Sequence, residues 1–274
     1  MIWVFVICVV VILLIAYKAY GAKNYLDPSA PFYSGNYAVQ EPGPLDKLTV
    51  LSYNIGYALN IDQASMEIKQ FRSQKGLDIL LLQEMDEVGM ERIAKDLQFN
   101  YVYYPAAVEP TYHKNFGNAV LSRWPIVDSW KLILPHKSFS NRMNRVATRA
   151  TIQIHGEEIL AYSIHTEPVF TLPKFKEDQY TAVLKDVCSD IKRAVVGGDF
   201  NSFTEPGIER MEDRYQEAGF ERASQGSGYT FVRWGCKMAP DHIFAKGFAV
   251  KDQGKIAEAT ASDHLPLWVR LMLK

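Results

Sequence analysis

Short apolar runs, most of them ending at a polar residue, recur along the chain from residue 48 onward. The runs are Leu48–Tyr53, Ile79–Leu82, Ala119–Leu121, Ile159–Ile164, Ala194–Val196, His242–Ala245 and Leu267–Leu273. Runs of this length are typical of buried strands. Segments with helical periodicity lie between them, at Ala64–Phe71, Met90–Leu97 and Lys176–Ile191. The alternation predicts one α/β layered domain over residues 47–274.

The first twenty residues have a different character. Met1 to Tyr17 carry no charged side chain, and Lys18 ends the run. As a helix, this segment spans roughly 26 Å, close to the ~30 Å hydrocarbon core of a bilayer. We predict a single-pass transmembrane anchor at residues 1–20, in place of a cleaved signal peptide or a buried core helix. Lys18 and Lys23 favour a cytoplasmic catalytic domain, but two charges leave the orientation open.

Residues 21–46 differ from both neighbours because they are rich in proline and glycine. This composition predicts a linker between anchor and domain.

The overall composition narrows the class of protein. The chain is 48% hydrophobic, which is enough for a large core. Its net charge of −1 provides no global attraction to nucleic acid. Three cysteines at unrelated spacings form neither a zinc motif nor a disulfide framework, although Cys188 and Cys236 could pair.

The segment 195–201, Val-Val-Gly-Gly-Asp-Phe-Asn, is the most informative in the chain. Alternate residues of an extended backbone point to the same side. Asp199 and Asn201 can therefore face one small group together, as a base or metal ligand beside a hydrogen-bond donor. A strand followed by a simple turn explains the same residues.

Polar residues also end the other runs, each with an ordinary explanation. Asn54 suits a turn, Glu84 suits a helix cap and His165 suits a structural histidine, while Asp263 and His264 suit a loop. Together they form a set of hard oxygen ligands for Mg²⁺ or Mn²⁺, with histidines for proton transfer. Such a set suits hydrolysis of a phosphoester.

The polar blocks occur in an order that resembles a known family. They are Ser52-Tyr53-Asn54-Ile55, Leu82-Gln83-Glu84, Gly117-Asn118-Ala119-Val120-Leu121-Ser122-Arg123, Ile164-His165-Thr166, Gly198-Asp199-Phe200-Asn201, Asp241-His242-Ile243-Phe244 and Ser262-Asp263-His264. The series resembles the endonuclease/exonuclease/phosphatase superfamily, which includes DNase I-like nucleases, neutral sphingomyelinases and inositol-polyphosphate phosphatases. The resemblance implies a two-sheet, four-layer α/β sandwich of the DNase I type, with its site at the strand ends.

The resemblance also assigns roles. It implies that Asn54, Glu84 and Asp263 hold the Mg²⁺ or Mn²⁺ ion. It implies that Asp199 orients or deprotonates the attacking water and that Asn201 binds the phosphate. His264 would stabilise the charge of the phosphate or shuttle a proton, with Asp241 as its orienting partner, and His165 would contact the phosphate.

The chain departs from the family pattern at two points. Gly56 stands where some relatives have an acidic residue, so metal binding would depend on Glu84. The carboxylate partner of His165 is left open between Glu109 and Glu167.

The substrate is the least determined part of the prediction. We expect Asn118 and Arg145 to bind it, Arg145 lying in a basic cluster at 141–149 that also suits a solvated strand. Phe231 and Trp234 precede Asp241 in a glycine-rich loop and are expected to line the substrate groove. We expect a membrane-tethered phosphodiesterase acting on a lipid headgroup. A nuclease of the same fold is the alternative, followed by a non-catalytic binding module. The oligomeric state is left open.

Overall fold

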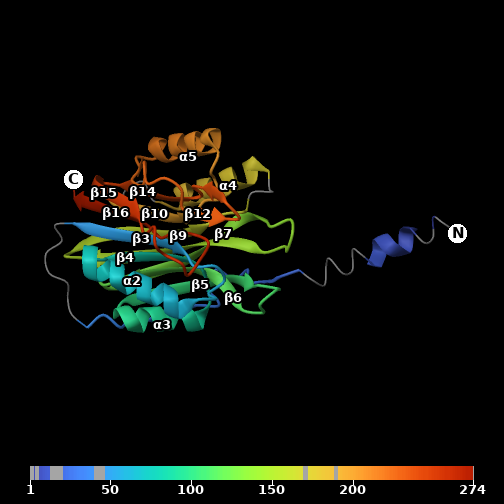
Figure 1. The fold of residues 1–274 in the computed structure, drawn as a ribbon, viewed down its shortest axis with the longest axis horizontal. Helices are drawn as coiled ribbons and strands as arrows, with labels where there is room; N and C mark the ends of the chain where they lie inside the picture. Colours follow the sequence, from blue (N-terminus) through green and yellow to red (C-terminus); the bar gives the residue numbers. More distant parts are fainter. Residues whose placement is uncertain are drawn as a thin grey trace.

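A computed structural model describes residues 3, 6–12, 21–39, 47–168, 172–187 and 191–273 of the protein. Two β-sheets pack face to face, and pairs of helices cover their outer faces (Figure 1). The predicted four-layer α/β sandwich is confirmed.

The first sheet joins the N-terminal and C-terminal parts of the chain. Its spatial order is β1-β5-β6-β4-β3-β16-β15, and β2 pairs with β5 beside this path. The strands are β1 (Lys23–Asn24), β2 (Tyr33–Gly35), β3 (Leu48–Asn54), β4 (Ile79–Met85), β5 (Asn100–Val108), β6 (Asn115–Ser122), β15 (Phe248–Lys255) and β16 (Leu267–Leu273).

The second sheet is built from the middle of the chain, in the order β11-β14-β10-β9-β8-β7. Its strands are β7 (Ile126–Lys137), β8 (Asn144–Ile154), β9 (Glu157–His165), β10 (Ala194–Asp199), β11 (Glu221–Arg222) and β14 (Asp241–Lys246). A separate hairpin consists of β12 (Phe231–Arg233) and β13 (Cys236–Met238).

Three apolar layers hold the sandwich together. The helices α2 (Ile61–Lys75) and α3 (Glu87–Leu97) pack on the outer face of the first sheet. The helices α4 (Pro173–Asp186) and α5 (Glu205–Glu217) pack on the outer face of the second. The third layer, between the sheets, includes Val50, Ile79 and Val195, all fully buried. Burial of these faces provides the main drive for folding.

The predicted elements are found, with two differences. Every predicted apolar run lies within a strand, and the three predicted helices correspond to α2, α3 and α4. The helix α4 ends at Asp186 rather than at Ile191, and residues 188–190 lie outside the described part. The helix α5 was not predicted because it is mostly polar and buries only Met211 and Tyr215.

The linker prediction for residues 21–46 is wrong for the part that the structure describes. The strand β1 pairs with the end of β5, and β2 pairs with its beginning. Short edge strands tolerate proline and glycine because only one side of the strand needs hydrogen bonds. Residues 21–39 therefore extend the first sheet, while residues 40–46 lie outside the described part.

The predicted anchor falls mostly outside the described residues, which include only residues 3 and 6–12 of it. Among the residues that the structure describes, no helix has the length and apolar character needed to span a bilayer. Cys188, the proposed partner of Cys236, also lies outside the described part. Cys236 itself is an exposed free cysteine.

The topology brings the polar strand ends together. The strand β3 is parallel to β4, and β9 is parallel to β10, so each pair ends at the same edge of its sheet. Gln83 of β4 joins the two sheets near this edge, since its amide donates to the Ser163 hydroxyl of β9 at 2.9 Å. The carboxyl ends of four strands therefore meet at one end of the sandwich.

Candidate active site

A cavity of about 690 Å³ opens at this end of the sandwich. The predicted site residues that line it are Glu84, Arg145, His165, Asp199, Asn201, Asp263 and His264. They come from both sheets and from the loops that follow β10 and precede β16. One cavity thus collects residues that are up to 180 positions apart in the sequence, counting from Glu84 to His264.

The backbone is unusual at two of these residues. Glu84 and Asn201 have φ angles of +59° and +49°, in the left-handed region that non-glycine residues rarely adopt. Such a conformation costs on the order of 1–3 kcal/mol and is concentrated at functional sites. At Gly198, a Cβ atom would lie 1.9 Å from the carbonyl oxygen of Ile164, so only glycine fits between β9 and β10.

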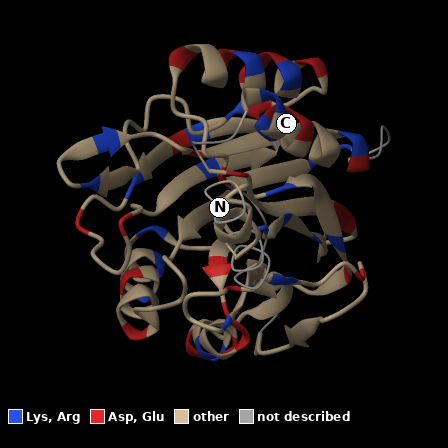
Figure 2. Cartoon of the chain, turned by 90° about the vertical axis from the view of Figure 1, so that its right-hand side faces the viewer, with Lys and Arg blue, Asp and Glu red and all other residues tan. Residues whose placement is uncertain are grey.

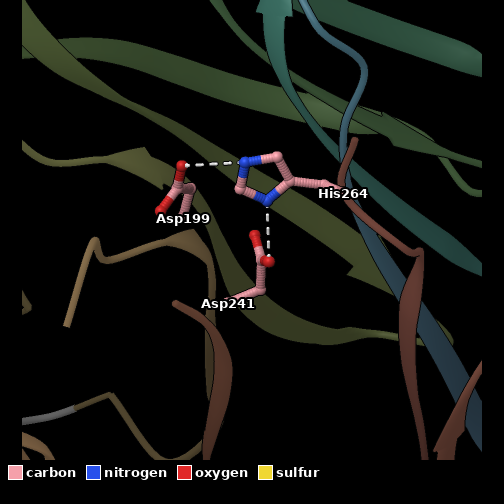
Figure 3. A group of neighbouring side chains, drawn as sticks. All are labelled: Asp199, Asp241 and His264. Atoms are coloured by element: carbon pink, nitrogen blue, oxygen red, sulfur yellow. Dashed lines mark hydrogen bonds and ion pairs between the residues drawn. The ribbon is translucent and has the colours of Figure 1, made fainter. Parts of the chain in front are cut away.

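His264 lies between two buried aspartates (Figure 3). Its Nδ1 is 2.9 Å from Oδ2 of Asp241, and its Nε2 is 3.7 Å from Oδ2 of Asp199. Although burial disfavours the charged imidazolium, the two carboxylates outweigh it and raise the pKa of His264 to about 10. His264 is therefore a cation at neutral pH. The predicted pairing of His264 with Asp241 has the expected geometry.

Asp199 is at the centre of the site. One carboxylate oxygen accepts a hydrogen bond from the Asn201 main-chain amide at 2.8 Å, and the other accepts one from the Asn54 side chain at 3.1 Å. Burial raises the pKa of Asp199 to about 7, opposed by the His264 cation and increased by Asp241. A carboxylate that titrates near neutral pH suits a general base.

Glu84 lies next to Asp199, across Asn54. The Asn54 amide nitrogen is 3.2 Å from Oε1 of Glu84, and the Tyr57 main-chain amide donates to Oε2 at 2.9 Å. Burial raises the pKa of Glu84. Asn54 thus links two buried carboxylates through its nitrogen.

Neither Glu109 nor Glu167, the two carboxylates predicted as partners of His165, pairs with this histidine directly. The Glu109 carboxylate accepts the main-chain amides of Thr111 and Tyr112, each at 2.7 Å, and so closes a turn. Glu167 is fully buried and accepts from Nε of Arg145 at 3.2 Å. Arg145, in turn, lies with one guanidinium nitrogen 3.3 Å from Nε2 of His165. Glu167 therefore reaches the histidine only through the arginine.

His165 is held as a neutral imidazole. Burial lowers its pKa well below the usual value, and the charges of Arg145 and His264 act in the same direction. Its Nε2 is 3.6 Å from Asp199 and 3.9 Å from Glu84. The neutral ring of His165 can donate one hydrogen bond and accept another, whereas the His264 imidazolium supplies a positive charge.

Comparison with known proteins agrees with this arrangement. The model of the endonuclease/exonuclease/phosphatase family matches residues 51–264. The chain belongs to this family. The match begins in β3 and ends at His264, so it includes both the strand ends and the site.

Curated relatives match over a shorter stretch. A UPF0294 protein of Vibrio campbellii is 30% identical over 122 residues, which are 43% of this chain and 42% of the relative. The match thus spans less than half the length of that relative.

Solved structures share the fold. The catalytic domain of human Nocturnin, solved with a bound sulfate anion, is 19% identical with a TM-score of 0.66, over 91% of this chain and 100% of that one. A D. rerio TDP2 complexed with a single-strand DNA product is 15% identical with a TM-score of 0.66, over 82% of this chain and 98% of that one. At these identities the likeness is one of fold.

The remaining predicted residues differ in their positions. Asn118 is buried and donates from its side chain to the main-chain carbonyls of Val146 and Ser163, at 2.6 and 3.2 Å. It is absent from the cavity lining, so in the structure it joins the two sheets rather than facing a substrate. Asp263 lines the cavity, and its carboxylate pairs with Arg233 at 3.6 Å.

Asn201 uses part of its side chain to fix its own loop, since Nδ2 donates to the Thr166 carbonyl at 3.1 Å. An amide carries two N–H donors, so this contact leaves a second donor at the cavity wall. The predicted phosphate contact of Asn201 is therefore compatible with its position.

Sequence reasoning missed two residues of the site. The Thr230 hydroxyl donates to Oδ2 of Asp241 at 2.6 Å and fixes this carboxylate against His264. Tyr57 supplies the main-chain donor to Glu84 and part of the cavity wall. Neither contact has a sequence signal, because both depend on loop conformation. Of the two aromatic residues expected in the groove, Phe231 lines the cavity and packs against His264, whereas Trp234 projects outside it.

The donor set fits a divalent cation. Asp199, Asp241 and His264 offer ligand atoms within 4.8 Å of one another, and Glu84 adds a further carboxylate next to Asp199. The imidazolium form of His264 has no free lone pair, so in that form only the carboxylates can bind a metal. Glu84, Asp199 and Asp263 line the cavity, and their hard oxygen donors suit Mg²⁺ or Mn²⁺. Metal binding through Asn54 requires its amide to turn, because Nδ2 faces the carboxylates and only the oxygen binds a metal.

Proposed function

We propose that the protein is a divalent-metal-dependent phosphoester hydrolase whose reaction centres on Asp199 and His264. One observation carries the proposal: a cationic His264 is held between Asp241 and the general-base candidate Asp199 inside a family-typical cavity. A base for water and a fixed positive charge near it are the two requirements of phosphoester hydrolysis that a protein can supply.

In this mechanism Asp199 accepts a proton from the attacking water as the water oxygen bonds to phosphorus. The P–O bond to the leaving group breaks, and the leaving oxygen takes up a proton from solvent water. The His264 imidazolium faces the phosphate and stabilises the charge that develops on its oxygens, while Asp241 and Thr230 fix the ring. Asn201 and the neutral His165 donate hydrogen bonds to the phosphate, and Arg145 adds a positive charge beside them. These roles extend the assignments that the sequence alone predicted.

Glu84, Asn54 and Asp263 are the proposed residues that would hold the Mg²⁺ or Mn²⁺ ion, which leaves Asp199 for the attacking water. The ion, when bound, supplies positive charge to the phosphoryl oxygen.

We propose a phosphodiester of the phospholipid type as substrate and the apolar segment 1–17 as the membrane anchor. The sequence of this segment and the charge distribution support the proposal. On the face seen in Figure 2, Lys and Arg are interspersed with Asp and Glu. A nuclease usually presents a continuous basic surface to the phosphate backbone.

The test is turnover by the purified full chain. With Mg²⁺ and bis(p-nitrophenyl) phosphate we expect hydrolysis that is lost in EDTA, is restored by added Mg²⁺ or Mn²⁺, and is absent in Asp199→Ala. Activity that persists in both EDTA and Asp199→Ala would refute the mechanism. Complete absence of Mg²⁺-dependent turnover would favour a non-catalytic binding module.

A nuclease is the second candidate. The D. rerio TDP2 structure of the same fold contains a single-strand DNA product, which supports a nucleic acid as an alternative phosphodiester. Salt-dependent cleavage of plasmid DNA, without turnover of phospholipid vesicles, would select this function.

A further inference from the structure

Exposed apolar side chains lie in the lining of the active-site cavity or directly next to lining residues in the sequence. Leu59 and Tyr112 line the mouth and are 49% and 43% exposed. Phe139, between two lining serines, is 83% exposed, and Trp234, at the tip of the β12–β13 hairpin, is 89% exposed. Four separate chain segments thus place large apolar groups around one opening, an arrangement that marks an interaction surface. We call these four side chains the apolar rim.

The predicted membrane segment enters the folded domain beside this rim. The main-chain amide of Ala22 donates to the carbonyl of Asn141 at 2.9 Å, and Asn141 lines the cavity. The Asn24 side chain donates to the Arg142 carbonyl at 2.9 Å and accepts from the Asn144 amide at 2.6 Å. The loop that carries Phe139 therefore also fixes residues 22–24, at the beginning of the described stretch 21–39.

Further contacts keep this entry point in place. Residues 23–24 pair with β5, and the buried Lys131 ammonium donates to the main-chain carbonyls of Tyr25 and Ala30. A buried ammonium needs such acceptors, so release of this segment would leave the charge of Lys131 unsatisfied. The entry point is thus part of the domain rather than the end of a free tether.

The stretch of chain between the apolar segment and the first residues held by the domain is short. Five chain steps separate Tyr17 from Ala22, and an extended chain covers at most roughly 18 Å over that number. If residues 1–17 lie in a bilayer, Ala22 is therefore close to the lipid. The cavity lining that Ala22 contacts is then also near the lipid, rather than a remote face of the domain.

The charged residues of the rim agree with a phosphate-rich surface. Arg233 lies next to Trp234, with its guanidinium 4.4 Å from the indole ring, and Lys114 follows Tyr112 closely in the sequence. Both side chains are about half exposed, and each has one carboxylate partner, Asp263 for Arg233 at 3.6 Å and Asp86 for Lys114 at 3.1 Å. Aromatic residues with neighbouring Arg and Lys are typical of side chains that enter the interface between water and lipid.

We propose that the apolar rim docks on the bilayer that holds residues 1–17, so that the cavity receives a phosphodiester headgroup directly from the membrane surface. This inference rests on the proposed function, which supplies the hydrolase activity and the membrane anchor. It adds which face of the domain contacts the lipid.

Depth-dependent quenching tests the orientation without an activity measurement. The full chain has five tryptophans, of which Trp124 and Trp268 are buried. In vesicles with brominated acyl chains, we expect a fraction of the fluorescence quenching to disappear in Trp3→Phe, and a second fraction to disappear in Trp234→Phe. Trp130→Phe is the control, because Trp130 is also exposed, at 41%, but lies within β7, and the lining residue Ser138 comes only after the end of that strand at Lys137.

The outcomes separate the two proposals. Quenching that depends on Trp3 but not on Trp234 would overturn the docked rim and leave the anchor intact. Quenching that depends on neither would overturn the anchor as well. If single-stranded DNA covers Trp234 while brominated lipid does not quench its fluorescence, the apolar rim binds a nucleic acid and not a bilayer, and the membrane-docking proposal is refuted.

A kinetic readout complements the spectroscopic one. For the double variant Phe139→Ser/Trp234→Ser, we expect the ratio of vesicle to soluble-phosphodiester turnover to fall about tenfold or more, because two buried aromatic contacts with the lipid are lost. Trp130→Ser should leave the ratio unchanged. An unchanged ratio in the double variant would refute the rim, whereas lack of soluble turnover in the wild type would refute the hydrolase.

Discussion

The two ends of the layer between the sheets are made by the same strands but differ in chemistry. At one end, Val50 and Ile79 pack against Val195 in a fully apolar contact. At the other end, Gln83, Asn118 and Ser163 join the sheets through buried hydrogen bonds, and the carboxylates follow within a few residues. One end is thus built for stability, and the other is built to fix polar groups.

The difference shows how the fold stabilises the buried charged groups of the site. A buried polar group is costly unless it is hydrogen-bonded, and Glu84, Asp199 and Asp241 each accept at least one hydrogen bond. The apolar end supplies stability that does not depend on the site. We therefore expect changes at the apolar end to affect folding, and changes at the polar end to affect catalysis.

The largest effect is expected for Asp199→Asn. Loss of the general base should lower kcat/KM by about 10²- to 10⁴-fold. Stability should not fall, because burial raises the pKa of this carboxyl to about 7 and its ionised form is disfavoured in the fold at higher pH. Thermal unfolding of the variant and the wild type in EDTA at pH 8 measures the effect on stability. A clear drop in Tm would mean that Asp199 is structural.

Ile79→Ala, at the apolar end, should lower stability and leave catalysis unchanged. A large-to-small change at a fully buried site leaves a cavity and costs about 2–5 kcal/mol of unfolding free energy. Urea titration measures this loss, and kcat/KM per folded molecule should stay at the wild-type value. A matching loss of kcat/KM would show that the two ends are coupled.

His242 should make stability depend on pH. Burial lowers its pKa to about 4, and Nε2 donates to the Ser202 carbonyl at 2.9 Å. The unfolded chain takes up the proton near pH 6.5, so this contribution is complete above pH 6.5 and is lost as the pH falls towards 4. The loss is on the order of 3 kcal/mol.

The control for this prediction is His242→Gln. Urea unfolding in EDTA between pH 7 and pH 4.5 should have a smaller slope in the variant than in the wild type. Equal slopes would assign the acid sensitivity to other groups, among them His165, whose pKa is also lowered by burial.

The smallest effect is expected for Glu167→Gln. Glu167 touches no substrate in the proposed mechanism but fixes Arg145 beside His165, so it is a positioning residue. We expect KM for a phosphodiester to rise about tenfold, with a smaller change in kcat. Inhibition by inorganic phosphate should weaken in parallel, and Arg145→Lys should behave in the same way. A fall in kcat alone would contradict the assignment.

Much of the site could be predicted because it uses short-range signals. Each apolar run buries a strand, and the residue at its carboxyl end must lie at a sheet edge, as Asn54 and His165 do. The strand β10 was recognisable in the same way, since its two glycines precede Asp199. The helix α5 was not, because an amphipathic pattern with two buried residues is too weak to separate from a polar loop.

The sequence by itself determined the layered α/β fold, the family and the identity of the residues at the strand ends, because periodicity and spacing are local properties of the chain. Only the tertiary structure decided which of these residues meet. In the structure Glu167 pairs with Arg145 instead of His165, and Asn118 faces the interface between the sheets. Residues 21–39 pair with the first sheet beside the cavity. Such contacts depend on distances between segments far apart in the chain, which no local pattern encodes.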